Sequence, residues 1–365
     1  MLLELVPRAE RSTLFSVLSP LVAFLVTLLF GLILFTALGV DPFRALYIYF
    51  VEPLTQLWSV EELIVKASPL ILIGCGLALC FRANVWNIGA EGQFTMGAIF
   101  GSAIPVLFPG AAGLWVLPAM VVFGAVGGAL YGLIPGVLKT RFNANEILTS
   151  LMLTYVALLL LDFLVRGPWR DPGSFNFPES RLFGDAGTLP ILVGNSRLHI
   201  GVTFGLIAAV ALGFMLKFSI RGFAIRLAGE APRAARFSGF RQNSIVLAVF
   251  AVSGALAGIA GISEVSGAIG QLRPEISPGY GFTAIIVAFL GRLNPFGIVV
   301  AGLVLALTYL GGEAAQVSLG LSDKVTRVFQ GLLLFTVLAF DTLIHYRVRL
   351  RGRRSGAGEK GAVHA

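Results

Sequence analysis

The stretch LFSVLSPLVAFLVTLLFGLILFTAL, residues 14–38, contains no charged side chain. A helix of about 20 apolar residues crosses the hydrocarbon core of a bilayer, which is about 30 Å thick. The stretch is therefore long enough to span a membrane, and its apolar run is longer than the core of a secretory signal peptide. It predicts a retained transmembrane helix near the N-terminus.

Similar apolar stretches recur along the rest of the chain. Charged residues make up 13% of the sequence and hydrophobic residues 56%, which excludes an ordinary soluble domain. Ten spans are expected, at residues 14–38, 64–81, 88–108, 114–138, 147–165, 198–216, 244–262, 280–290, 296–310 and 325–345. Those at 88–108, 280–290 and 296–310 are short or begin with glycines and a carboxylate, so broken or re-entrant helices are expected there. The predicted fold class is an all-α integral membrane protein.

The distribution of Lys and Arg predicts how the spans are oriented. If the N-terminus is cytoplasmic, the cytoplasmic segments hold 18 of these residues and the external segments 9, which together account for all 27. Both termini are then cytoplasmic. The resulting division is a cytoplasmic arm at 1–13, a transmembrane domain at 14–346 with a cytoplasmic loop at 217–243 and an external loop at 166–197, and a basic cytoplasmic tail at 347–365. This topology and anionic lipid explain the net charge of +8, and nucleic-acid binding is not expected.

The sequence lacks the residue patterns of several enzyme classes. None of the five lysines directly follows a glycine, so a Walker-type phosphate loop is absent and the chain itself is not expected to hydrolyse ATP. The three histidines lie far apart along the chain, which supports neither a metal site nor a histidine-dependent catalytic triad. We therefore expect no enzyme activity, no metal and no cofactor in this chain.

The cytoplasmic loop contains the segment GEAPRAARFSGF at residues 229–240. Pro232 is typical of a first helical turn and Gly239 of a helix end, so a short surface helix is expected between them. Its small apolar side chains would fit a groove on a partner protein. The alternative is an interfacial helix whose arginines contact anionic headgroups, and the pattern alone leaves both open.

This segment resembles the coupling helix of permeases from binding-protein-dependent ABC importers of the branched-chain amino acid, ribose and nucleoside group. The runs RANVWNIGAEGQ at 82–93 and GYGFTAIIVAFLGRLNP at 279–295 look like signatures of the same family. The external run RGPWRDP at 166–172, with NEI at 145–147, is similar to the larger permease subunit of nucleoside importers. The resemblance covers residues 59–341.

The resemblance implies a type II ABC importer permease in a bacterial cytoplasmic membrane. Its expected partners are a separate ATPase that binds ATP and Mg²⁺, a second permease that is a different homologous chain, an external substrate-binding protein and membrane lipid. The expected solute is nucleoside-like, with riboflavin or a simple sugar as alternatives. The residues that would couple to the ATPase are Gly229, Glu230, Pro232, Arg233, Ala235, Arg236 and Gly239.

Polar residues at the start of the span at 88–108 are the candidates for the substrate path. They are Asn87, Glu91 and Gln93, because a carboxylate inside a membrane is costly and should face protein or water. In the competing interpretation Glu91 complements the positive end of its own helix, with Asn87 as the cap, and no ligand is needed. Asn143 is likewise expected to cap the span at 147–165 in a capping box with Glu146.

Two sets of closely spaced glycines are expected at helix–helix contacts. They are Gly124, Gly127 and Gly128 in one span and Gly254, Gly258 and Gly261 in another. The external loop is expected either to meet a substrate-delivering protein or to be an inert ordered loop.

An ion-coupled secondary transporter is the main rival function. Its candidate ion-binding residues would be Glu91, Asp162 and Glu264, but that scheme gives the cytoplasmic loop no purpose. A membrane-embedded enzyme is a weaker rival, since the sequence offers no nucleophile or metal constellation for it.

Overall fold

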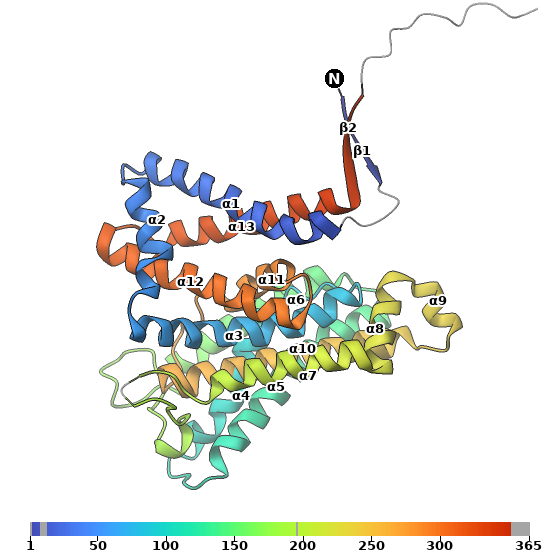
Figure 1. Ribbon diagram of the computed structural model, residues 1–365. Helices are drawn as coiled ribbons and strands as arrows, with labels where there is room; N and C mark the ends of the chain where they lie inside the picture. Colours follow the sequence, from blue (N-terminus) through green and yellow to red (C-terminus); the bar gives the residue numbers. More distant parts are fainter. Residues whose placement is uncertain (1, 8–12, 195, 352–365) are drawn as a thin grey trace, which may run out of the picture.

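The computed structural model describes residues 2–7, 13–194 and 196–351 (Figure 1). The α-helices are α1 (Thr13–Ala37), α2 (Pro42–Phe50), α3 (Leu57–Arg82), α4 (Ala90–Leu107), α5 (Val116–Phe142), α6 (Glu146–Arg166), α7 (Gly201–Phe218), α8 (Ile220–Glu230), α9 (Pro232–Phe237), α10 (Gln242–Glu264), α11 (Tyr280–Leu290), α12 (Pro295–Leu319) and α13 (Asp323–His345). Two strands, β1 (Leu2–Pro7) and β2 (Tyr346–Arg351), form an antiparallel pair. A π-helical turn, Val265–Ile269, extends α10.

The all-α fold class is confirmed, and each of the ten predicted spans corresponds to one helix. Among the described residues, six helices are long and apolar enough to cross a membrane, namely α3, α5, α6, α7, α10 with its π-helical turn, and α12. Residues 22–37 of α1 and the whole of α11 are shorter apolar helices. The chain is therefore a multi-pass membrane protein.

Three local features differ from the sequence prediction. Helices α2 and α8 were not expected, because both are short and lie between spans. Asn145, rather than Asn143, caps α6: its side chain accepts bonds from the N–H groups of Ile147 (2.9 Å) and Leu148 (3.4 Å). Asn143 instead ends α5 in a left-handed conformation with φ 53°, so the predicted capping box is wrong.

Helix α10 lies at the centre of the packing, against α3, α4 and α5. A Cβ atom on Gly128 would collide with the carbonyl oxygen of Gly254, and one on Gly258 would collide with that of Gly124. Backbone therefore touches backbone where α5 crosses α10, which confirms the predicted role of these glycines in close helix packing. We call α3, α4, α5 and α10 the glycine-packed centre.

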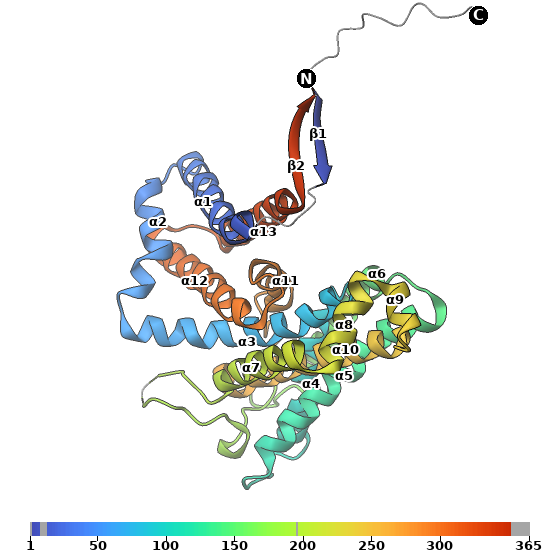
Figure 2. The ribbon, with the colours of Figure 1, turned by 45° about the vertical axis from the view of Figure 1, so that its right-hand side comes forward.

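Helices α1 and α13 form a separate pair. In both ribbon views they lie side by side, with α11 and α12 between them and α3 (Figures 1 and 2). The hydroxyls of Thr27 and Thr336 are 2.8 Å apart across this pair. At its end, β1 pairs with β2 in a register that sets Leu2 opposite Arg351, so residues of the expected arm and tail form a small sheet. Residues 352–365 of the tail lie outside the described residues.

The two ends of the helical bundle carry different features. The β1–β2 sheet and the α8–α9 turn emerge at one end, and the connection between α6 and α7 emerges at the other (Figures 1 and 2). This arrangement agrees with an even number of crossings between the two chain ends.

Candidate functional site

Helices α8 and α9 form a hairpin that projects from the bundle (Figure 2). Ser219 caps α8 by accepting a bond from the N–H of Gly222 (3.0 Å). As predicted, α9 begins at Pro232, and Gly239 follows it with φ 84°. We call Ile220 to Gly239 the coupling hairpin, and it contains all seven residues predicted to meet an ATPase.

The side chains of the coupling hairpin divide into an inner and an outer set. Ala235 is buried, whereas Glu230, Arg233 and Arg236 are exposed. Phe237, which the sequence did not single out, is 93% exposed. Phe237 and these three charged residues therefore make up the outer face of the coupling hairpin.

The coupling hairpin rests on the C-terminal end of α3. A Cβ atom on Gly229 would collide with the carbonyl oxygen of Arg82, so only glycine permits this approach. Arg82 also lies within electrostatic reach of Arg226 and Glu230. The end of α3 and the coupling hairpin are therefore in direct contact.

Arg82 extends this contact to the turn between α11 and α12. Its Nε donates a hydrogen bond to the carbonyl oxygen of Leu293 at 2.9 Å. Arg292 and Leu293 both have φ 56°, a conformation that non-glycine residues rarely adopt. The ring of Phe289, at the end of α11, stacks on Phe81 with centroids 5.0 Å apart. The coupling hairpin is thus linked through the end of α3 to α11.

The N-terminus of α11 meets the N-terminus of α4. The N–H of Gly281 donates to Glu91 Oε2 at 2.5 Å, and a Cβ atom on Gly281 would collide with the backbone of Glu91. The carboxylate therefore lies at the positive ends of two helices. Both helices follow non-helical segments, and broken helices at these two places stay a prediction. The third stretch expected to be broken, 296–310, lies within α12, which is one continuous helix of 25 residues. We call the contact of Gly281 with Glu91 the α4–α11 crossing.

The other two predicted path residues bond to the chain itself. Asn87 Nδ2 donates to Gln93 Oε1 (3.0 Å) and Ser253 Oγ (3.1 Å), and Gln93 Nε2 donates to Asn87 Oδ1 (3.1 Å). Asn87 Oδ1 also accepts from the N–H of Gly89. All three side chains, including that of Glu91, are buried. In this conformation the three form part of the helix packing, and their contact with a solute stays a prediction.

A second buried polar group lies where α11, α12 and α13 meet, and the sequence did not reveal it. The Thr283 and Tyr309 hydroxyls are 2.6 Å apart, and Gln330 Nε2 donates to Thr308 Oγ1 at 3.2 Å. The rings of Tyr280 and Tyr309 meet edge to face with centroids 5.7 Å apart. We call these five residues the tyrosine cluster. Uncharged polar side chains inside spans are the signal that could have found them, but only the fold brings the three helices together.

Charged side chains lie beyond the tyrosine cluster, toward the end that carries the α6–α7 connection. Lys66 Nζ is 2.9 Å from Glu313 Oε1, and Arg197 Nη1 is 3.3 Å from Glu62 Oε1. Glu313 follows Tyr309 by one helical turn, so this ion cluster adjoins the tyrosine cluster. Within the described residues no group of three His, Cys, Asp or Glu side chains could hold a metal ion.

The α6–α7 connection is attached to the turn after α10. Backbone N–H groups of Ser180 and Leu189 donate to the carbonyl oxygens of Leu272 (3.0 Å) and Ser266 (2.9 Å). His199 lies beneath, 3% exposed, and its ring nitrogens have no hydrogen-bond partner among the described residues. Burial, assisted by the positive charge of Arg197, lowers the pKa of His199 to about 4, so its ring is neutral at pH 7.

Comparison with known proteins identifies a family. Residues 59–338 match the family described as branched-chain amino acid transport system / permease component, close to the expected 59–341. The glucose ABC transporter permease protein TsgB13 of Haloferax volcanii is 36% identical over 366 residues, covering 97% of this chain and 95% of the relative. The guanosine ABC transporter permease protein NupP of Bacillus subtilis is 30% identical, covering 77% of this chain and 81% of the relative. The nucleoside ABC transporter permease protein NupB of Lactococcus lactis is 27% identical, covering 88% of this chain and 90% of the relative.

Proposed function

Because this chain belongs to the family of branched-chain amino acid transport system permease components, we propose that it is one permease subunit of an ATP-driven importer for an uncharged sugar or nucleoside. The names of the relatives support this range of solutes, since they specify glucose, guanosine and nucleosides. The sugar ring with its hydroxyl groups is common to all of them.

The tyrosine cluster is the observation that carries the choice of an uncharged solute. Aromatic rings can pack against the face of a sugar or a base, and hydroxyl and amide groups can exchange hydrogen bonds with its polar edge. The five side chains carry no formal charge and are buried. We propose that α13 moves relative to α11 and α12 to expose them to the solute.

The α4–α11 crossing also supports an uncharged solute. Helix N-termini that meet inside a membrane can bind the carboxylate of a solute such as an amino acid. Here Glu91 already accepts the N–H of Gly281 and lies within hydrogen-bonding reach of Ser277. The carboxyl group of Glu91 thus already occupies the place that a solute carboxylate would take, which disfavours an amino acid as the solute. Asn87 and Gln93 stay predicted path residues only for a conformation in which the crossing opens.

We propose that the coupling hairpin docks on a separate ATPase subunit, which binds ATP and Mg²⁺. Glu230, Arg233 and Arg236 would meet its groove, Ala235 would anchor α9, and Pro232 and Gly239 would set the ends of α9. Gly229 would let the hairpin press on Arg82. Closure of the ATPase would then move the α11–α12 turn and shift the balance between two access states.

The proposed orientation puts the coupling hairpin and the β1–β2 sheet on the cytoplasmic side. The α6–α7 connection would then face a substrate-binding protein outside, and a second, homologous permease would complete the path. The chain would lie in the cytoplasmic membrane, with 1–13 and 347–365 inside.

Uptake into proteoliposomes tests the proposal. The chain is reconstituted with its candidate ATPase, second permease and binding protein, and labelled glucose, guanosine, riboflavin and leucine are compared. Saturable, ATP-dependent uptake of glucose or guanosine is expected, with riboflavin and leucine excluded. Uptake that persists without the ATPase and follows an ion gradient would instead establish a secondary transporter.

A further inference from the structure

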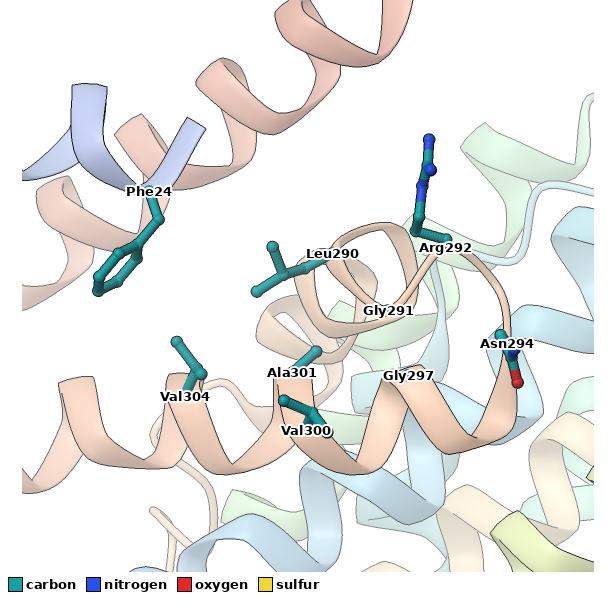
Figure 3. A pocket seen from close by; sticks show the side chains of 9 residues that line it. All are labelled: Phe24, Leu290, Gly291, Arg292, Asn294, Gly297, Val300, Ala301 and Val304. Atoms are coloured by element: carbon teal, nitrogen blue, oxygen red, sulfur yellow. The ribbon is translucent and has the colours of Figure 1, made fainter. Parts of the chain in front are cut away.

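A groove separates α1 from the turn between α11 and α12 (Figure 3). Its volume is about 530 Å³. Phe24 of α1 forms one wall, and Leu290 of α11 and Val304 of α12 form the other. Arg292 and Asn294 stand at one end. This volume lies within the range of about 300–1,000 Å³ that is usual for sites that bind small molecules.

The lining of the groove changes from apolar residues on α12 to Arg292 in the turn that precedes this helix. Gly297, Val300, Ala301 and Val304 follow one another along this helix and offer no charge. The seven helical steps from Gly297 to Val304 rise by about 10 Å, and one leaflet of the hydrocarbon core is about 15 Å deep. The apolar part thus has the length of most of one acyl chain within a leaflet.

The cationic end of the groove lies at the end of the bundle that carries the coupling hairpin. Arg292 precedes Leu293, whose carbonyl oxygen accepts the bond from Arg82, and Arg82 in turn contacts Gly229 of the coupling hairpin. The order from apolar interior to arginine therefore runs from the membrane interior toward the membrane surface. An anionic phospholipid matches this order, because its acyl chain lies in the membrane interior and its phosphate at the surface. Basic pockets between spans on the cytoplasmic side bind anionic headgroups.

We propose that this groove binds one anionic phospholipid of the leaflet nearest the coupling hairpin. One acyl chain lies along α12 between Phe24 and Val304, and the phosphate lies at the guanidinium of Arg292. This site is distinct from the tyrosine cluster and does not depend on which solute is imported. The lipid fills the space between α1 and the α11–α12 turn, so it stabilises the conformation in which these two are separated.

Photocrosslinking in the assembled importer tests the proposal. A benzoylphenylalanine replaces Val304, and the complex is placed in vesicles that contain equal amounts of phosphatidylglycerol and phosphatidylcholine. The control carries the same probe at Leu159, which is 70% exposed on α6 and should meet ordinary surrounding lipid. Adducts are identified by mass spectrometry. If the first position disturbs assembly, the probe is placed at Val300 instead.

The expected result is a preference of about 5-fold for phosphatidylglycerol at position 304 and no preference at position 159. Arg292→Gln should abolish the preference at 304, and Arg292→Lys should retain part of it. Equal adducts of both lipids at 304 in the unchanged chain would overturn the proposal. So would a peptide adduct from the second permease, because the groove would then be a subunit interface.

Discussion

The glycine-packed centre and the region of α11 to α13 hold their helices together by opposite means. In the centre, α5 and α10 touch through backbone atoms at Gly124, Gly128, Gly254 and Gly258. Around α11 to α13, large side chains intervene, buried hydroxyl and amide groups form hydrogen bonds, and a groove of about 530 Å³ remains open. Backbone contact leaves no room for sliding, whereas side-chain contacts can exchange partners. We therefore expect the glycine-packed centre to act as a rigid scaffold and the region of α11 to α13 to be the part that moves.

The largest effect is a loss of folded protein when a side chain is added inside the glycine-packed centre. Gly258→Val would drive a side chain into the carbonyl oxygen of Gly124 and into α5. Overpacking of this kind costs about 1–3 kcal/mol or more, so a large loss of folded, monodisperse protein after extraction is expected. Gly331→Ala on α13 is the matched control, because nothing lies within 4 Å of the added methyl group. Equal yields of the two variants would contradict a rigid centre.

The next largest effect is a loss of uptake when the contact between the coupling hairpin and the α11–α12 turn is weakened at Arg82. Arg82→Gln removes the hydrogen bond to the carbonyl oxygen of Leu293, and a loss of ATP-dependent uptake of about 10-fold is expected, within the usual range of coupling free energies. Arg141→Gln at the exposed C-terminal end of α5, outside the coupling hairpin, is the control.

The readout of the Arg82 experiment must separate coupling from folding. Both variants should assemble with the ATPase, and ATP hydrolysis should continue in Arg82→Gln, so that more ATP is consumed for each solute molecule. Partial recovery in Arg82→Lys would support the role of the positive charge. Parallel loss of assembly and uptake would instead indicate a purely structural residue.

A double substitution on α8 and α9 tests the surface that is predicted to dock on the ATPase. Glu230→Ala combined with Arg233→Ala leaves buried Ala235 and the fold of α9 in place. Uptake should fall several-fold while the protein still inserts into the membrane, because exposed charges that would contact the ATPase are removed. Co-purification with the ATPase measures the loss directly, and unchanged co-purification would place the docking surface elsewhere.

A smaller effect is expected at the tyrosine cluster. Tyr309→Phe removes the hydroxyl next to Thr283, and a hydrogen bond contributes about 1 kcal/mol, so the KM for solute should rise about 5-fold with little change in maximal uptake. Thr336→Val, which removes the buried bond to Thr27 away from the cluster, is the control and should leave the KM unchanged. If both variants raise the KM equally, the cluster has no special role.

The smallest effect concerns the outer attachment of the α6–α7 connection. His199 has a pKa of about 4 when folded and about 6.5 when unfolded, so the unfolded form binds more protons between these values and stability falls as pH drops through this window. Between pH 7 and pH 6 the loss is about 0.7 kcal/mol. The protection factors of residues 180–191, which correct for the slower intrinsic amide exchange at lower pH, should fall over this range, and His199→Gln should reduce the fall. An equal fall in the variant would assign it to another group.

The two regions also differ in how far the sequence could predict them. The hydrophobic runs predicted a helix at each of the ten places, and Pro232 with Gly239 predicted α9, because these signals are local. The α4–α11 crossing joins residues 190 positions apart, and Thr283 lies 47 residues from Gln330. Periodicity and composition contain no information about which spans are neighbours. The side chains that bond across helices could therefore be recognised as polar but not assigned to one another.

The short sheet of β1 and β2 joins the segments before α1 and after α13 through hydrogen bonds, so that the path of the chain closes on itself as a ring. Because Leu2 lies opposite Arg351, the first and last spans are fastened at their ends as well as along their length. Neither α1 nor α13 can be displaced alone, so whatever opens the tyrosine cluster must carry the N-terminus with it. A circular permutant, with the old ends joined and new ends cut beside Gly194, should keep every span in its present order around the ring.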